Sequence, residues 1–215
     1  MLPQTHYDYE NRQMCPEPVE HSRAEVRRAQ ILAAAVDCFR QHGFHGASIS
    51  QISKAAGMSP GHIYHYFENK EAIISAIVAS DLERFLVLTA EIRSACNVRE
   101  AMLARVAEGI DQCLDPLTAG LKLEIVAEAS RNPHVAEIVR TADQVCRESL
   151  MLTMRDMRHA AGHDDDDTTL AAMVEVFVAM FEGLQIRTIR NQDIDRSIVI
   201  PLFQNALRNL LDHTP

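Results

Sequence analysis

Signals for the start of a helix recur along this chain, and no stretch of alternating apolar and polar residues, the pattern of a half-buried β-strand, interrupts them. Ser22 and Glu25 form a capping box, in which the serine oxygen accepts a backbone N–H and the glutamate reaches back to the cap. Ser48 and Gln51 repeat this arrangement. Between the two boxes, apolar residues recur every three or four positions until Gly43. We therefore predict a helix that begins after Ser22 and ends at Gly43, and a second helix that begins after Ser48.

Two short helices are predicted around the next glycine. Gly57 ends the second helix, and Ser59 is a typical N-cap for a third. Pro60 then stands at the first helical position, where the missing N–H is not needed. The third helix is also short, because Asn69 caps the one that follows. Two short helices joined by a tight turn and packed on a longer one predict a helix-turn-helix.

The rest of the chain is predicted to be helical as well. One long helix runs from Asn69 to about Arg93, and the later breaks fall near Asn97, Asp115-Pro116, Asn132-Pro133, residues 162–167 and residues 191–195. The predicted fold class is all-α, with about nine helices and no sheet. We expect a disordered tail over residues 1–20, a helix-turn-helix domain over residues 21–68 and a larger helical domain over residues 69–215.

The distribution of charge and the cysteine content favour an intracellular DNA-binding protein over a secreted, disulfide-bonded one. The net charge is −9, yet residues 21–75 carry six Arg and Lys against four Asp and Glu, a net charge of +2. A mildly basic head on an acidic body is typical of a protein that touches DNA with one end only. The five cysteines are odd in number and include no C-x-x-C pair, which favours a reducing cytoplasm over a disulfide framework. The sequence indicates no signal peptide and no membrane span.

Residues 48–73 hold a series of short motifs, Ala56-Gly57, Ser59-x-Gly61, Ile63-Tyr64, Tyr66-Phe67 and Lys70. In order and spacing these motifs resemble the DNA-binding signature of the tetracycline-repressor (TetR) family. Ser53 stands where the family usually has alanine, and Met58 where it usually has valine. Both are small changes near the turn.

The resemblance implies a set of DNA contacts, and the chemistry of these residues agrees with it. The N-terminal residues of a recognition helix face base edges in the major groove. Hydroxyls and a lysine at helix N-termini suit phosphates. The residues expected to read bases are Ser59, Pro60, Gly61, His62 and His65, and those expected to hold phosphates are Ser48, Tyr64, Tyr66 and Lys70.

Two other interpretations of this segment are open. The aromatic residues Tyr64, Tyr66 and Phe67 are also what packing between short helices requires, although the full signature favours a DNA role for the tyrosines. The local histidines, His42, His45, His62 and His65, resemble metal ligands in number only, because just two of them share a helix and no acid or cysteine is fixed beside them. We therefore predict no metal site.

The C-terminal domain carries a second, shorter resemblance. Residues 121–133 are similar to a segment of TetR regulators related to choline-response and multidrug-efflux repressors. The resemblance implies a ligand inside a helical bundle and a dimer made by the last two helices, whose apolar residues cover more than one face. The candidate ligand contacts are Met102, Glu124, Glu128, Met151, Met173 and Phe177. The candidate dimer contacts are Phe177, Phe181, Leu184, Phe203, Leu207 and Leu210.

The expected function is repression relieved by a small molecule. The partners would be double-stranded operator DNA, a second copy of the chain, and an effector that is amphipathic or cationic, with efflux or stress genes as targets. No nucleophile paired with a base and no phosphate-binding glycine loop is present, so we expect neither catalysis nor a cofactor. The acidic run His163–Asp167 is interpreted as a solvated turn. The alternatives are an activator or ligand-independent regulator on the same fold, and a carrier or enzyme that retains the head domain.

Overall fold

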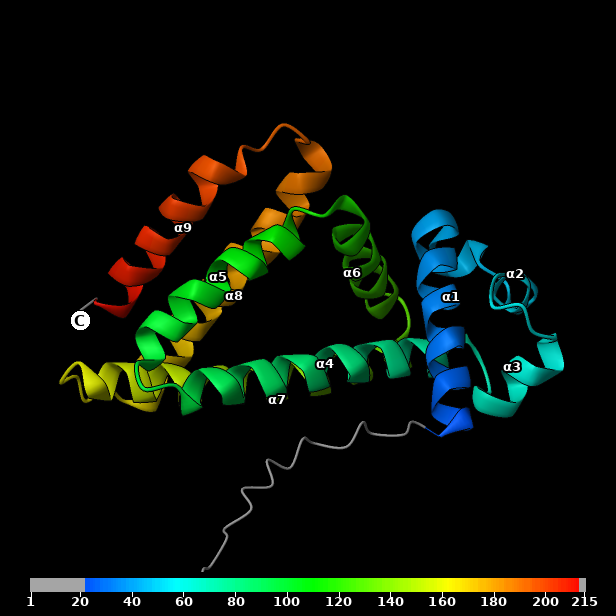
Figure 1. Ribbon diagram of the computed structural model, residues 1–215, viewed down its shortest axis with the longest axis horizontal. Helices are drawn as coiled ribbons and strands as arrows, with labels where there is room; N and C mark the ends of the chain where they lie inside the picture. The colour runs from blue at the N-terminus through cyan, green and yellow to red at the C-terminus, as the bar shows by residue number, and fades with distance from the viewer. Residues whose placement is uncertain (1–21, 213–215) are drawn as a thin grey trace, which may run out of the picture.

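The computed structural model describes residues 22–212, and the tail expected at residues 1–20 lies outside them. Within the described residues the chain forms nine α-helices and no strand, which confirms the predicted all-α class (Figure 1). The helices are α1 (Arg23–Gly46), α2 (Ile49–Ala55), α3 (Pro60–Tyr66), α4 (Lys70–Ser94), α5 (Val98–Cys113), α6 (Pro116–Ala129), α7 (Pro133–Ala160), α8 (Asp167–Arg190) and α9 (Arg196–Leu211).

The predicted helix starts are confirmed by their caps. The two capping boxes are both formed, at Ser22 and at Ser48. The later breaks supply N-caps whose side chains accept backbone N–H groups, at Asn69, Asn97, Asp115, Asn132, Asp166 and Asp195. The end of α1 differs in detail from the prediction. Gly43 leaves the helical conformation at φ 68° and ψ 170°, and one more turn follows before the chain reaches α2.

Two hydrophobic cores organise the molecule. The first joins α1, α2, α3 and the start of α4, and it also takes Leu121 and Ile125 from α6 and Val135 from α7. The second joins the end of α4 with α5, α7, α8 and α9. Helices α4 and α7 pack along each other, so they connect the two cores (Figure 1). The helix-turn-helix therefore lies at one end of the molecule, and α9 lies toward the other.

The acidic run between α7 and α8 is not only a solvated turn. Asp165 is partly buried, with its side chain only 5% exposed, and it binds the buried Arg158 through two of the guanidinium nitrogens. The guanidinium beside it holds the pKa of Asp165 below its usual range. Arg158 also donates to the Leu211 carbonyl, so this ion pair fastens the end of α7 to the end of α9. The run looked solvated in the sequence because its buried partner lies seven residues away.

Helix α8 is long and apolar enough, by length and composition, to cross a membrane. Within the described residues it packs against α5, α6 and α7 of this chain. Several of its apolar side chains, among them Val176, Ile186 and Ile189, are nevertheless exposed.

Candidate nucleic-acid interface and effector domain

The first hydrophobic core holds the turn between α2 and α3 in place, because residues of both helices pack into it. Gly57 adopts φ 65°, the left-handed conformation that a tight turn after a helix requires. Ile63 of α3 is fully buried, and Phe67 just after α3 is covered by the Arg28 guanidinium, 5.0 Å from the ring centre. Gln30 of α1 donates to the Ala56 carbonyl at the end of α2. These contacts set the angle at which α3 leaves the body.

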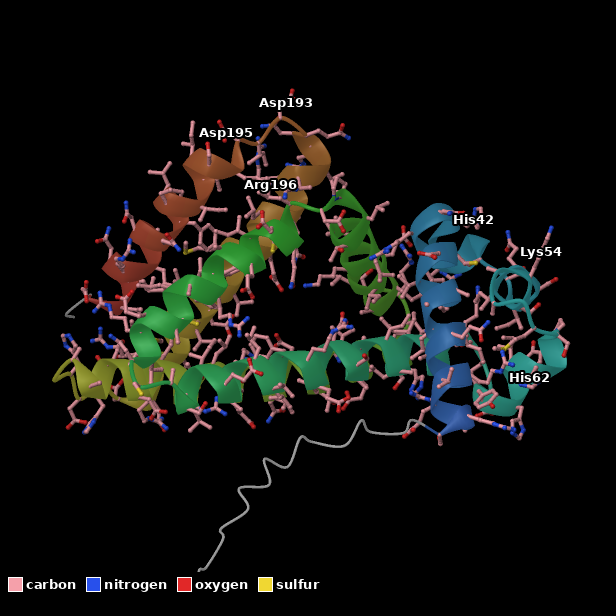
Figure 2. The ribbon with its side chains drawn as sticks, in the orientation of Figure 1. His42, Lys54, His62, Asp193, Asp195 and Arg196 are labelled. Carbon is pink, nitrogen blue, oxygen red and sulfur yellow. The ribbon has the colours of Figure 1, made fainter. Side chains whose placement is uncertain are left out.

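The outward side of α3 holds the residues expected to read DNA. Its first turn is exposed, and so are the side chains one turn further on, namely Ser59, Pro60, Gly61, His62, Tyr64 and His65. Tyr64 is 57% exposed, which leaves its hydroxyl accessible to an outside partner. Tyr66 is half-buried, and its ring centre lies 5.7 Å from the tilted His62 ring and 5.2 Å from the His65 ring, which it meets edge-on. Figure 2 shows His62 at the end of the molecule, away from α5, α8 and α9.

Packing within the described residues does not explain Gly61. A Cβ at this position would meet no atom within 4 Å, and the backbone is helical. Glycine in a helix is about 1 kcal/mol less favourable than alanine, so it needs another reason to be present. Close approach of an outside surface to the backbone is such a reason.

The two predicted phosphate contacts at helix starts have different surroundings. Ser48 is exposed and caps α2 by accepting from the Gln51 N–H. The ammonium of Lys70 points into the chain, where it donates to the carbonyls of Phe44 at 2.7 Å and Ala47 at 2.9 Å. Two of its three donors are therefore used internally. The phosphate role of Lys70 remains a prediction.

Lys54 is a cation that the sequence-based site did not include. It lies exposed in the last turn of α2, and Figure 2 shows it on the same outer end of the molecule as His62. The available signal was its position, one of only two lysines in the mildly basic segment 21–75.

The six candidate ligand contacts do not meet in one site. Met102, Met173 and Phe177 are buried in the second core, and Met151 packs against it. The two glutamates, Glu124 and Glu128, instead face the end of α1. Apolar residues on a helix predict burial, but they do not say whether a cavity or a packed core surrounds them.

The candidate dimer contacts are occupied within one chain. Phe181 lies between Phe177 and Phe203, with ring centres 4.9 and 4.8 Å apart, and Leu207 is fully buried. Leu184 and Leu210 pack against the same core. The exposed apolar residues of the last two helices are on the opposite stripes, namely Val176, Ile186, Ile189, Ile198 and Leu202. Periodicity indicates two apolar faces, but it does not tell which one meets the chain's own core.

A charged group spans α6, α7 and α8. The acids Glu175 and Glu182 stand out in the sequence because they lie on a strongly apolar helix, but their neighbours on α6 and α7 are too far away in the chain to be predicted. Arg147 of α7 pairs with Asp143 and with Glu175 of α8, at 2.9 and 3.2 Å. Burial, with the charges of Asp143 and Glu175, raises the pKa of Glu182, and Lys122 of α6 partly offsets this rise. Within residues 22–212, no cation forms an ion pair with Glu182. The group thus holds three carboxylates, Asp143, Glu175 and Glu182, against two cations, Arg147 and Lys122.

An open groove of about 410 Å³ also follows α4. Its walls come from this one helix, through Ala79, Leu82, Glu83, Leu86, Val87 and Ala90. Sites for drug-sized ligands enclose most of the ligand surface, which a single helix does not do. Groups of three or more possible metal-ligating side chains are absent among the residues described.

Comparisons with known proteins agree with this geometry. Residues 31–77 match the family described as bacterial regulatory proteins, tetR family, and residues 98–212 match the BetI-type transcriptional repressor, C-terminal family. The regulator UidR of Escherichia coli K12 is 32% identical over 148 residues, which cover 69% of this chain and 74% of that protein. The repressor Rv1474c of Mycobacterium tuberculosis is 28% identical over 88% of this chain and 97% of its own length.

Solved structures share the fold over nearly the whole described chain. GusR of Salmonella enterica superposes with a TM-score of 0.74 at 29% identity, covering 89% of this chain and 98% of that one. FadR of Bacillus subtilis, solved in complex with stearoyl-CoA, gives a TM-score of 0.72 at 19% identity and covers 87% and 99%. The chain therefore belongs to the TetR family of helix-turn-helix transcriptional regulators and carries a C-terminal domain of the BetI type.

Proposed function

We propose that this chain is a cytoplasmic repressor that binds operator DNA as a homodimer and is released by a small-molecule effector. The observation that carries the proposal is the outer side of α3, which the described part of the chain leaves uncovered. Membership of a family of DNA-binding regulators, and relatives that are named repressors, support it. Residues 22–68 would form the DNA-binding domain, and the helices from α4 onward the effector and dimerisation domain.

Binding to DNA would use two recognition helices in successive major grooves. Helix-turn-helix dimers bind half-sites about 34–36 Å apart, so a near-palindromic operator is expected. Ser59 through His62 and His65 would contact base edges, while Ser48, Tyr64, Tyr66 and the outward Lys54 would contact phosphates.

Selection of bound duplexes from a random pool tests this proposal directly. The purified chain should recover a two-fold symmetric motif and bind it at least about 10³-fold more tightly than random DNA at the same salt concentration. Replacing Tyr64 with alanine should weaken this binding while the dimer persists. Recovery of no motif at any salt concentration would reject the repressor proposal.

The dimer would be built from the exposed stripes of the last two helices. Along α8, the small or apolar residues Ala172, Val176, Ala179, Gly183 and Ile186 are spaced three or four apart and are all exposed. On α9, Ile198 and Leu202 are 58% and 62% exposed. Contiguous exposed apolar surface of this kind marks interfaces, and closed two-fold symmetry is the commonest solution.

The effector would be an amphipathic cation bound beside α6, α7 and α8. The support is the excess carboxylate at Glu182, since a raised pKa means that a positive charge nearby would be favourable. The FadR structure indicates that this fold accommodates an amphipathic ligand in another protein. To relieve repression, the effector must bind the DNA-incompetent state more tightly than the competent one.

Alkyl trimethylammonium ions, with alkyl sulfates of equal chain length as controls, test the effector class. The cations should raise the melting temperature and release the selected operator, and the Glu182→Gln variant should lose both responses. Operator release by the sulfates alone would exclude a cationic effector without affecting the DNA-binding proposal.

A further inference from the structure

The end of α1 is held between α6 and the start of α4. The Phe44 N–H donates to Glu124 Oε2 of α6 at 3.2 Å, across 80 residues of sequence. On its other side, the carbonyls of Phe44 and Ala47 accept from Lys70 at the start of α4. Residues 43–47, which we call the junction segment, therefore contact two helices of the proposed effector domain, α6 and the start of α4.

A second carboxylate from α6 strengthens this contact. Glu128 is 2% exposed, and its Oε2 lies within ion-pair distance of His45 Nε2 in the junction segment, at 2.8 Å. Within the described residues this oxygen accepts no hydrogen bond, so a protonated His45 is the cation nearest to it. The other neighbours of Glu128 are Asn132, which donates to Oε1 at 3.2 Å, and Arg131, whose guanidinium is 3.6 Å away. A buried carboxylate needs a paired donor, because desolvation without one is strongly unfavourable. Glu128 therefore favours the position of α1 in which His45 reaches it.

The backbone of the junction segment is shaped for this contact. Gly43 has φ 68°, and a Cβ there would lie 3.2 Å from Glu124 Oε2. A side chain at position 43 would thus strain the backbone and displace the carboxylate together. The first hydrophobic core continues across the same boundary through Leu121 and Ile125 of α6.

We propose that Glu124 and Glu128 are positioning residues that couple the effector domain to the recognition helix through residues 43–47. The inference rests on the proposed DNA-binding function. Because coupling between two sites is reciprocal, operator DNA bound at α3 should in turn change the dynamics of α6. This reverse effect can be measured without knowledge of the effector.

Hydrogen exchange of peptides from α6, with and without a duplex carrying the selected operator, tests the coupling. In the natural chain, bound operator should change α6 exchange rates by about fivefold or more, the lower range of allosteric coupling. The double variant Glu124→Gln and Glu128→Gln should still bind the operator but lose this change. Glu137→Gln, which removes one exposed charge from the neighbouring α7, is the matched control and should keep it.

A second variant guards against a folding defect. His45→Gln removes the partner of Glu128 from an exposed position, and it should reduce the α6 response in a chain of unchanged helix content. If the natural chain binds the operator and α6 does not respond, or if all variants respond equally, the coupling is overturned. If no duplex binds the natural chain, the proposed function fails and the inference fails with it.

Discussion

Gly61 is the residue at which folding and function make opposite demands. Alanine there should raise stability by up to about 1 kcal/mol, since a helical glycine is unfavourable and no atom of the described chain would meet the new methyl group. The same methyl group should weaken operator binding by about 1–3 kcal/mol, the range for a base contact. Gly120→Ala also meets no atom of the described chain, so it should leave operator affinity unchanged. Equal operator affinity of Gly61→Ala and the natural chain would exclude close approach of DNA at α3.

Lys70 distinguishes an internal role from a phosphate contact. Lys70→Met keeps the aliphatic stem but leaves the Phe44 and Ala47 carbonyls without their charged donor. We expect the free energy of unfolding to fall by about 1.5–3 kcal/mol, as measured by denaturant titration. Lys54→Met, at an exposed position of α2, should leave stability unchanged. If both variants are fully stable and only operator binding suffers, Lys70 acts solely on phosphate.

In the absence of effector, the ionised carboxylate of Glu182 should lower the stability of the folded chain at neutral pH. Its pKa is raised in the folded chain, mainly by burial, so the folded state holds this proton more tightly than the unfolded state. Stability therefore falls as pH rises from the unfolded pKa through the raised folded pKa. Glu182→Gln should melt at a higher temperature than the natural chain at pH 7.5, and the difference should vanish at acidic pH. Glu148→Gln on the exposed side of α7 serves as the control, and a difference independent of pH would contradict this account.

At the scale of helices, the sequence predicted where elements begin and end better than what they face. Caps such as Ser59 and Asn69 act through local hydrogen bonds, so their effect is visible within a few residues. The side of α3 that is expected to contact bases could also be predicted, because the caps fix where this short helix begins and the family signature indicates its role. The partners of Glu124 and Glu128 could not be predicted, because they belong to the junction segment, which lies about 80 residues away in the chain.

For α8 and α9, the apolar pattern likewise predicts two apolar faces without telling which of them meets the chain's own core. The structure leaves Leu202 of α9 exposed, and this leads to a prediction. Leu202→Asp on α9 should raise the dimer dissociation constant by about thirtyfold or more, the effect of losing about 2 kcal/mol at an interface centre. Analytical ultracentrifugation measures this directly. Leu117→Asp on α6 is the matched control, since Leu117 is 60% exposed and Leu202 is 62% exposed. A Leu202→Asp chain that stays dimeric would place the interface elsewhere.

For the whole molecule, the distribution of charge should govern how the operator is approached. An acidic chain of net charge −9 is repelled by DNA except at its mildly basic end, where Lys54 faces outward beside α3. Removing one cation that binds a phosphate lowers the slope of log affinity against log salt by about 0.9. Because a dimer carries two copies, Lys54→Ala should reduce this slope by roughly 1.8 for the selected operator and for random DNA alike. An unchanged slope would show that Lys54 meets no phosphate, and a weakening confined to the selected site would instead indicate that Lys54 binds a base.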